Sequence, residues 1–128
     1  MTQAEARDDD VLLVLTTLPD ADTAGTVARK LLEARVAACV NRLAACESHY
    51  WWQGALETAT EWPLLIKTTR GRYAALEQTM REVHPYEVPE LIALPVQAGL
   101  PSYLGWVRDE VAPQGAAAAG KLSNLDKE

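Results

Sequence analysis

The side chains with the greatest capacity for chemistry are gathered in one short segment, residues 84–90. His84, Tyr86, Glu87 and Glu90 supply it with an imidazole, a phenol and two carboxylates. Imidazole nitrogen and carboxylate oxygen bind borderline divalent metals such as copper(II), zinc and nickel, and the same groups can transfer protons. A proline-rich turn can also be simply a rigid connection. The segment can therefore be a metal site, a proton-transfer site or a rigid connection.

Two prolines, Pro85 and Pro89, stiffen this segment. Each proline fixes its own φ and moves the preceding residue out of the helical region, so a helix that reaches His84 must end there. A helical pattern over residues 72–83 precedes the segment, and a strand pattern over residues 91–96 follows it. Loops held between rigid elements are where binding sites tend to be built.

The periodicity of apolar residues predicts the elements that position this segment. Their order is β-α-β-β-α-β with a further helix at the end. Right-handed crossovers place the first two helices on one face of a four-stranded antiparallel sheet. The fold class is therefore α+β, a ferredoxin-like βαββαβ sandwich with an extra C-terminal helix. The predicted strands are residues 11–18, 37–53, 57–69 and 91–96, and the predicted helices are residues 21–35, 72–83 and 102–111.

Prolines and apolar runs also indicate the place of each strand in the sheet. Residues 11–18 form a continuous apolar run, which is typical of a central strand. Pro95 indicates that the last strand lies at an edge, and Pro63 should interrupt or bulge the pairing of the third strand.

The hairpin between the second and third strands is longer than a domain of this size needs. We expect its tip, with Gly54 at the turn, to project as an arm. Consecutive strand residues face opposite sides, so Trp51 and Trp52 cannot easily both enter one small core. Large aromatic side chains are enriched at interface centres. Tyr50, Trp51 and Trp52 are therefore predicted interface residues.

Composition predicts one domain and a cytoplasmic protein. The 128 residues suffice for a single core, which we assign to residues 11–112 between a polar tail (1–10) and a flexible tail (113–128). The sequence has no apolar run long enough to span a membrane, and the N-terminal residues do not resemble a signal peptide. The net charge of −6 disfavours nucleic acid and anionic membranes as partners.

The two cysteines, Cys39 and Cys46, are seven positions apart within one predicted strand. An odd spacing points them to opposite faces, so no disulfide between them is expected. Reduced thiols are consistent with the cytosol. Cys46 and His49 are secondary candidates for a metal ligand.

Several motifs together resemble the signature of the CutA divalent-cation tolerance proteins, and the resemblance covers about residues 11–111. It implies a ferredoxin-like fold and a homotrimer packed through its sheets and hairpin arms. It also implies a response to divalent metal ions, and no catalytic reaction is established for the family. The motifs are residues 38–41, 50–54, 65–68 and 84–90, with similar spacing to Tyr103 and Trp106.

The resemblance also implies a metal site. Some bacterial members bind copper through a cysteine at the end of the first strand, together with the histidine and final glutamate of the proline-rich loop. The matching positions here are Thr16, His84 and Glu90. A hydroxyl thus replaces the soft thiolate that selects copper(I). The expected metal ligands are His84 and Glu90, binding Cu²⁺ or another divalent metal weakly, with no obligatory cofactor.

Two other functional classes stay open. The first is a regulator that binds a small molecule in clefts between subunits, because the family resembles the PII-like signalling proteins in architecture. The second is an enzyme that uses His84, Tyr86 and a glutamate for proton transfer. The sequence has no recognised nucleophile–base pair or phosphate loop, so we expect no enzymatic activity. Binding of an organic ligand without metal would separate a regulator from a metal-binding protein.

Overall fold

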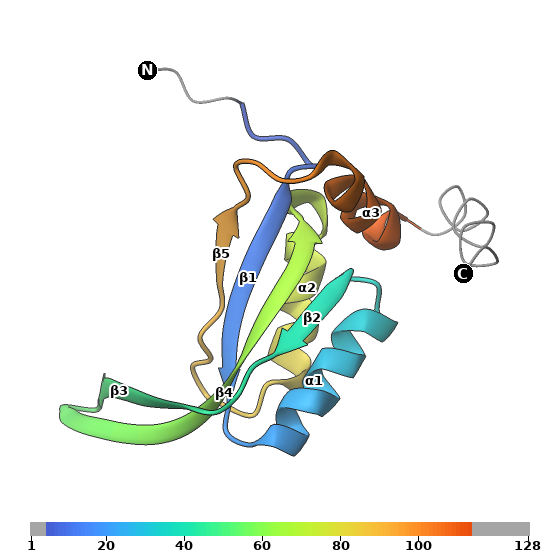
Figure 1. Cartoon of the computed structure of the whole chain (residues 1–128). Coiled ribbons are helices and arrows are strands. Elements are labelled where there is room, and N and C mark those ends of the chain that lie inside the picture. The colour runs from blue at the N-terminus through green and yellow to red at the C-terminus, as the bar shows by residue number, and fades with distance from the viewer. Residues whose placement is uncertain (1–4, 114–128) are drawn as a thin grey trace.

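Eight helices and strands follow one another in the part of the chain that the computed structural model describes, residues 5–113 (Figure 1). Six of the seven predicted elements are present with ends within two residues of the predicted ones, and the seventh, residues 37–53, is divided into two strands. None of the helices in this part is long and apolar enough to cross a membrane. The elements are β1 (Val11–Leu18), α1 (Ala21–Glu33), β2 (Cys39–Arg42), β3 (Cys46–Trp52), β4 (Ala55–Thr69), α2 (Arg70–Val83), β5 (Ile92–Pro95) and α3 (Pro101–Val111).

The main sheet is antiparallel, with the strand order β2-β4-β1-β5. β1 lies at its centre, where Val14 is opposite Ile66 of β4 on one side and Ala93 of β5 on the other. β5 is an edge strand. The central position of the first strand and the edge position of the last are both as predicted, and the fold is the ferredoxin-like α+β arrangement.

One element differs from the prediction, because residues 37–53 form two strands instead of one. β2 pairs with residues 64–67 of β4, and β3 pairs with residues 55–61. The interruption lies beside Pro63, which has no backbone N–H for the ladder. Its carbonyl still accepts a hydrogen bond from the N–H of Leu43 (3.0 Å). The proline therefore ends one ladder and lets the chain begin another with a different direction.

The core lies between the sheet and the helices α1 and α2, which cover one of its faces. Complete burial of such apolar side chains contributes about 1.5–3 kcal/mol each. α3 packs on β4 and β1 near the start of β1, where Val107 and Val111 are buried. The fully buried side chains of the main core include Val14, Leu18, Leu31, Leu64, Ile66, Leu76 and Met80.

The described part of the predicted N-terminal tail contacts the domain. Its backbone carbonyls hold the chain against the start of α2 and against α3, so the tail is attached just before β1. The remaining residues of the two predicted tails, 1–4 and 114–128, lie outside the described residues. The three contacts are Arg70 N–H to Asp10 O (2.8 Å), Gly71 N–H to Asp8 O (2.8 Å) and Arg108 Nε–H to Asp9 O (2.7 Å).

β3 and the first half of β4 form a two-stranded ribbon that projects from the domain as the predicted arm (Figure 1). Trp52 pairs with Ala55, so the turn between the strands consists of two residues, Gln53 and Gly54. Both have positive φ, 51° and 82°. Positive φ at both positions is the mark of a type I′ turn, whose twist matches that of the flanking strands.

Replacing Gly54 tests the importance of this turn. In Gly54→Ala the new Cβ must accept the left-handed conformation, at a cost of about 1 kcal/mol, so the melting temperature should fall. Gly105→Ala in α3 is the matched control, because its Cβ meets nothing within 4 Å and alanine favours a helix. Calorimetry at a fixed chain concentration compares the two. Equal melting temperatures for Gly54→Ala and the parent would contradict the proposed strain.

Candidate functional site

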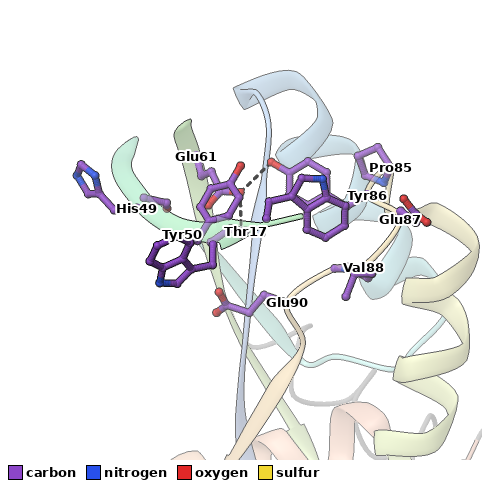
Figure 2. Close-up of a pocket in the computed structure, with 13 residues that line it drawn as sticks. Thr17, His49, Tyr50, Glu61, Pro85, Tyr86, Glu87, Val88 and Glu90 are labelled. Carbon is purple, nitrogen blue, oxygen red and sulfur yellow. Dashed lines mark hydrogen bonds between the residues drawn. The ribbon is translucent and has the colours of Figure 1, made fainter. Parts of the chain in front are cut away.

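A pocket of about 840 Å³ lies where the arm leaves the domain (Figure 2). Its walls come from the end of β1, from the two strands of the arm and from residues 85–90. The proline-rich segment singled out in the sequence thus forms one wall, and the aromatic stretch of the arm forms another. Aromatic side chains and carboxylates dominate the lining: Tyr50, Trp51, Trp52 and Tyr86, with Glu61, Glu87 and Glu90.

His84 fastens the proline-rich segment to the central strand. Its Nε2 lies 2.8 Å from the carbonyl oxygen of Thr17, and its Nδ1 lies 3.2 Å from the backbone nitrogen of Tyr86. Because a carbonyl only accepts and a backbone N–H only donates, Nε2 carries the hydrogen and Nδ1 is the acceptor. Both ring nitrogens are therefore engaged inside the chain, and the side chain is buried, at 8% exposure.

Burial lowers the pKa of His84 from its ordinary value of 6.5. The carbonyl of Thr17 and the negative charge of Glu61 act in the opposite direction but do not cancel the effect of burial. The imidazole is therefore neutral at pH 7, as its acceptor role toward the Tyr86 amide requires.

A second set of hydrogen bonds joins three elements at the floor of the pocket. The hydroxyls of Tyr86 and Thr17 both donate to Oε2 of Glu61, at 2.8 and 3.2 Å (Figure 2). The ring of Tyr86 also lies 4.9 Å from that of His84. Burial raises the pKa of Tyr86, and the hydrogen bond to Glu61 and its charge raise it further. The phenol therefore stays protonated and remains a donor.

Glu61 and Thr17 are site residues that the sequence analysis missed. Glu61 is buried, at 7% exposure, although it belongs to the strand that leads into the arm. Residues 57–61 contain two glutamates, Glu57 and Glu61, and nothing in their pattern indicates that one of them is buried. The one available signal was its position two residues before Pro63, where the pairing of β4 changes partner.

The structure brings Glu87 and Glu90 to the same pocket, and both are exposed. Figure 2 shows their carboxylates pointing in different directions. Thr16, which the resemblance matches to a cysteine of some bacterial CutA proteins, is buried on the helix side of β1, and its hydroxyl has no hydrogen-bond partner among the described residues. Within residues 5–113, no three His, Cys, Asp or Glu side chains are grouped so that they could hold one metal ion. The assignment of His84 and Glu90 as metal ligands stays a prediction.

The remaining candidates lie on or near the arm. Trp51 is 71% exposed, whereas Tyr50 and Trp52 are about 40% exposed. The ring of His49 is engaged on the surface of the arm by Glu47 (2.9 Å) and by Thr58 (3.1 Å). Cys39 and Cys46 are both free, and they lie in two strands, β2 and β3, rather than in the one strand that the sequence predicted.

Comparison with known proteins gives one consistent result. The family described as CutA1 divalent ion tolerance protein matches residues 12–110. The divalent-cation tolerance protein CutA of Thermus thermophilus is 42% identical over 97 residues, which are 76% of this chain and 94% of that protein. The CutA homolog of Xenopus laevis is 47% identical over 95 residues, which are 74% of this chain but only 63% of that protein.

Solved structures agree with the sequence comparison. CutA from Xylella fastidiosa has a TM-score of 0.77 and 43% identity, over 80% of this chain and 98% of that one. CutA1 from Shewanella sp. SIB1 has a TM-score of 0.78 and 43% identity, over 81% and 97%. The CutA of Archaeoglobus fulgidus, with a TM-score of 0.76 and 33% identity over 79% and 98%, is described as periplasmic.

The buried imidazole predicts how stability depends on pH. The unfolded His84 binds a proton near pH 6.5, whereas the folded one does so only at lower pH. The unfolded state therefore binds more protons as the pH falls through 6.5, and the free energy of unfolding should decrease until the pH passes the folded pKa.

Denaturant unfolding between pH 8 and pH 5, at a fixed chain concentration, measures this decrease. The decrease should be smaller in His84→Gln, which cannot titrate in this range. His49→Gln on the arm, which removes the other imidazole of the sequence, is the matched control. An identical pH dependence in His84→Gln and the parent would show that this imidazole is not the titrating group.

Proposed function

The chain belongs to the CutA1 divalent ion tolerance family, and we propose that it contributes to divalent-cation tolerance as a cytoplasmic homotrimer. Membership of this family is the observation that supports a role in divalent-cation tolerance. The arm supports the assembly, and the acidic pocket at its base supports an interaction with cations. The free thiols of Cys39 and Cys46 support the cytoplasmic location. The relatives named above are called CutA or CutA1, which gives no support to a PII-like regulator.

The arm is the observation that most strongly supports self-association. A two-stranded ribbon alone is at best marginally stable in water, and this one exposes 71% of Trp51 and 68% of Leu56. The edge strand β5 similarly exposes about half of Ile92 and of Leu94. Unprotected edges and apolar patches of this kind are usually covered by a partner. A second copy of the chain would cover both the arm and the edge of β5. The resemblance to CutA proteins favours an assembly of three copies.

Residues 5–113 do not form a ready metal site within one chain. Both nitrogens of His84 are engaged, and the hydroxyl of Thr16 is buried among core residues. The accessible donors are the carboxylates of Glu87 and Glu90. We therefore propose weak binding of Cu²⁺ that involves Glu90, with His84 contributing only after its Nδ1 has released the amide of Tyr86.

The assembly proposal predicts a mass of about 42 kDa in solution, three times the 14.0 kDa of one chain. Multi-angle light scattering on the purified protein measures it. Trp52→Ala should weaken the assembly by about 2 kcal/mol or more per interface, as expected for an interface anchor, and sedimentation at decreasing concentration measures the loss. A monomeric parent at micromolar concentration would refute the trimer. A variant that resists dilution as the parent does would place Trp52 outside the interface centre.

The metal proposal predicts a micromolar affinity for Cu²⁺ that exceeds the affinity for Zn²⁺, as the general order of metal affinities requires. Titration calorimetry on the tag-free protein measures both. Glu90→Gln and His84→Ala should each weaken Cu²⁺ binding without loss of the trimer. Glu33→Gln, which removes the same charge from an exposed position of α1, should not. Parent-like Cu²⁺ binding by both variants would place the metal elsewhere, with Cys46 and His49 the next candidates.

A further inference from the structure

The pocket at the base of the arm combines aromatic rings with carboxylates, and the described residues that line it include no lysine or arginine. Four of its thirteen lining residues are Tyr or Trp, and three are Glu. Aromatic faces attract cations, and the carboxylates add negative charge on the same wall. The volume of about 840 Å³ lies within the range of small-molecule sites. Such a lining favours a ligand that carries positive charge on an apolar body and disfavours phosphates and other anions.

Glu61 is the residue at which the charge of such a ligand would be neutralised. Its side chain is buried, at 7% exposure. No lysine or arginine of residues 5–113 forms an ion pair with it. Both of its side-chain hydrogen bonds, from Thr17 and Tyr86, reach Oε2. Oε1 accepts none from the described residues. A buried carboxylate without a counter-charge is costly, so a cation with N–H donors would stabilise it.

The groups around Glu61 increase the negative character of this place. Glu87 and Glu90 lie on the same lining, and neither forms an ion pair within the described part of the chain. The pKa of Tyr86 is raised by burial first and then by Glu61, with a smaller contribution from Asp20. The phenol therefore donates to the carboxylate and does not neutralise it.

The chemistry of the wall distinguishes an organic cation from a metal ion. Divalent metals take several oxygen, nitrogen or sulfur ligands, but the groups nearest to Glu61 are hydroxyls that already donate to it. The rings of Tyr50, Trp51 and Trp52 offer apolar surface and π faces instead. A protonated amine uses both features, because its N–H groups can donate to the carboxylate while its carbon skeleton contacts the rings.

We propose that this pocket binds a small organic amine in its protonated form, with the ammonium group on Glu61 and the apolar body against the aromatic side chains of the arm. This site goes beyond the proposed metal response and needs no metal. Because the arm is also the element that we assign to the trimer interface, the site must be tested in the assembled protein.

Titration calorimetry with phenethylamine, which is protonated at pH 7.5, tests the proposal in a buffer that contains EDTA. We expect saturable binding with a Kd of about 1 mM or lower. Phenethyl alcohol, which has the same body without the charge, should bind at least tenfold more weakly. Since EDTA removes free metal, the outcome is independent of whether the protein binds Cu²⁺.

Variants locate the site, after light scattering has shown that each keeps the mass of the parent. Glu61→Gln should weaken phenethylamine binding at least tenfold. Tyr86→Phe keeps the carboxylate and removes only one donor to it, so it should bind at least as tightly as the parent. Glu33→Gln is the charge-matched control and should bind as the parent does.

Three results would overturn the proposal. They are equal affinity for the amine and the alcohol, parent-like binding by Glu61→Gln, and the absence of saturable amine binding by the parent. The last result would be seen if a side chain of a neighbouring copy filled the pocket. If Glu61→Gln fails to fold, the ratio of amine to alcohol affinity still decides, because it is measured on the parent.

Discussion

The buried imidazole of His84 is the contact on which the geometry of the site depends. One ring nitrogen donates to the carbonyl of Thr17 at the end of β1, and the other accepts from the amide of Tyr86 in the loop. A single side chain thus ties the loop that follows α2 to the end of the central strand. Tyr86, whose backbone amide is held in this way, donates its hydroxyl to Glu61. The side chain most suggestive of metal binding therefore has a structural task in this chain.

The same residue marks how far sequence reasoning can go. Elements follow from local rules, so the strands, the helices and the end of α2 at His84 were predicted within two residues. The exception is the division of residues 37–53 into β2 and β3, which depends on Pro63 in the partner strand. The loop was recognised as chemically capable from its composition. Its contacts were not predictable, because they join residues 25 and 67 positions apart in the chain.

Glu61 and the aromatic side chains of the arm together give the pocket both negative charge and aromatic surface. Large aromatic rings are usually found in the core, but the arm carries its rings away from the core. Glu61 adds a buried carboxylate at the base of the arm. Thr16 lies on the opposite side of β1 among core residues. The surface chemistry of this site therefore rests on carboxylates and aromatic rings rather than on a thiolate.

β4 belongs to both parts of the molecule, because its fifteen residues run without a break from the turn of the arm to the start of α2. Glu61 lies on this strand at the point where the arm joins the sheet. A neighbouring subunit that grips the arm and a ligand that contacts Glu61 would thus act on one continuous backbone. If assembly strengthens ligand binding by a certain free energy, ligand binding must strengthen assembly by the same free energy. With such a coupling, the affinity of the pocket for its ligand would depend on the concentration of the subunits.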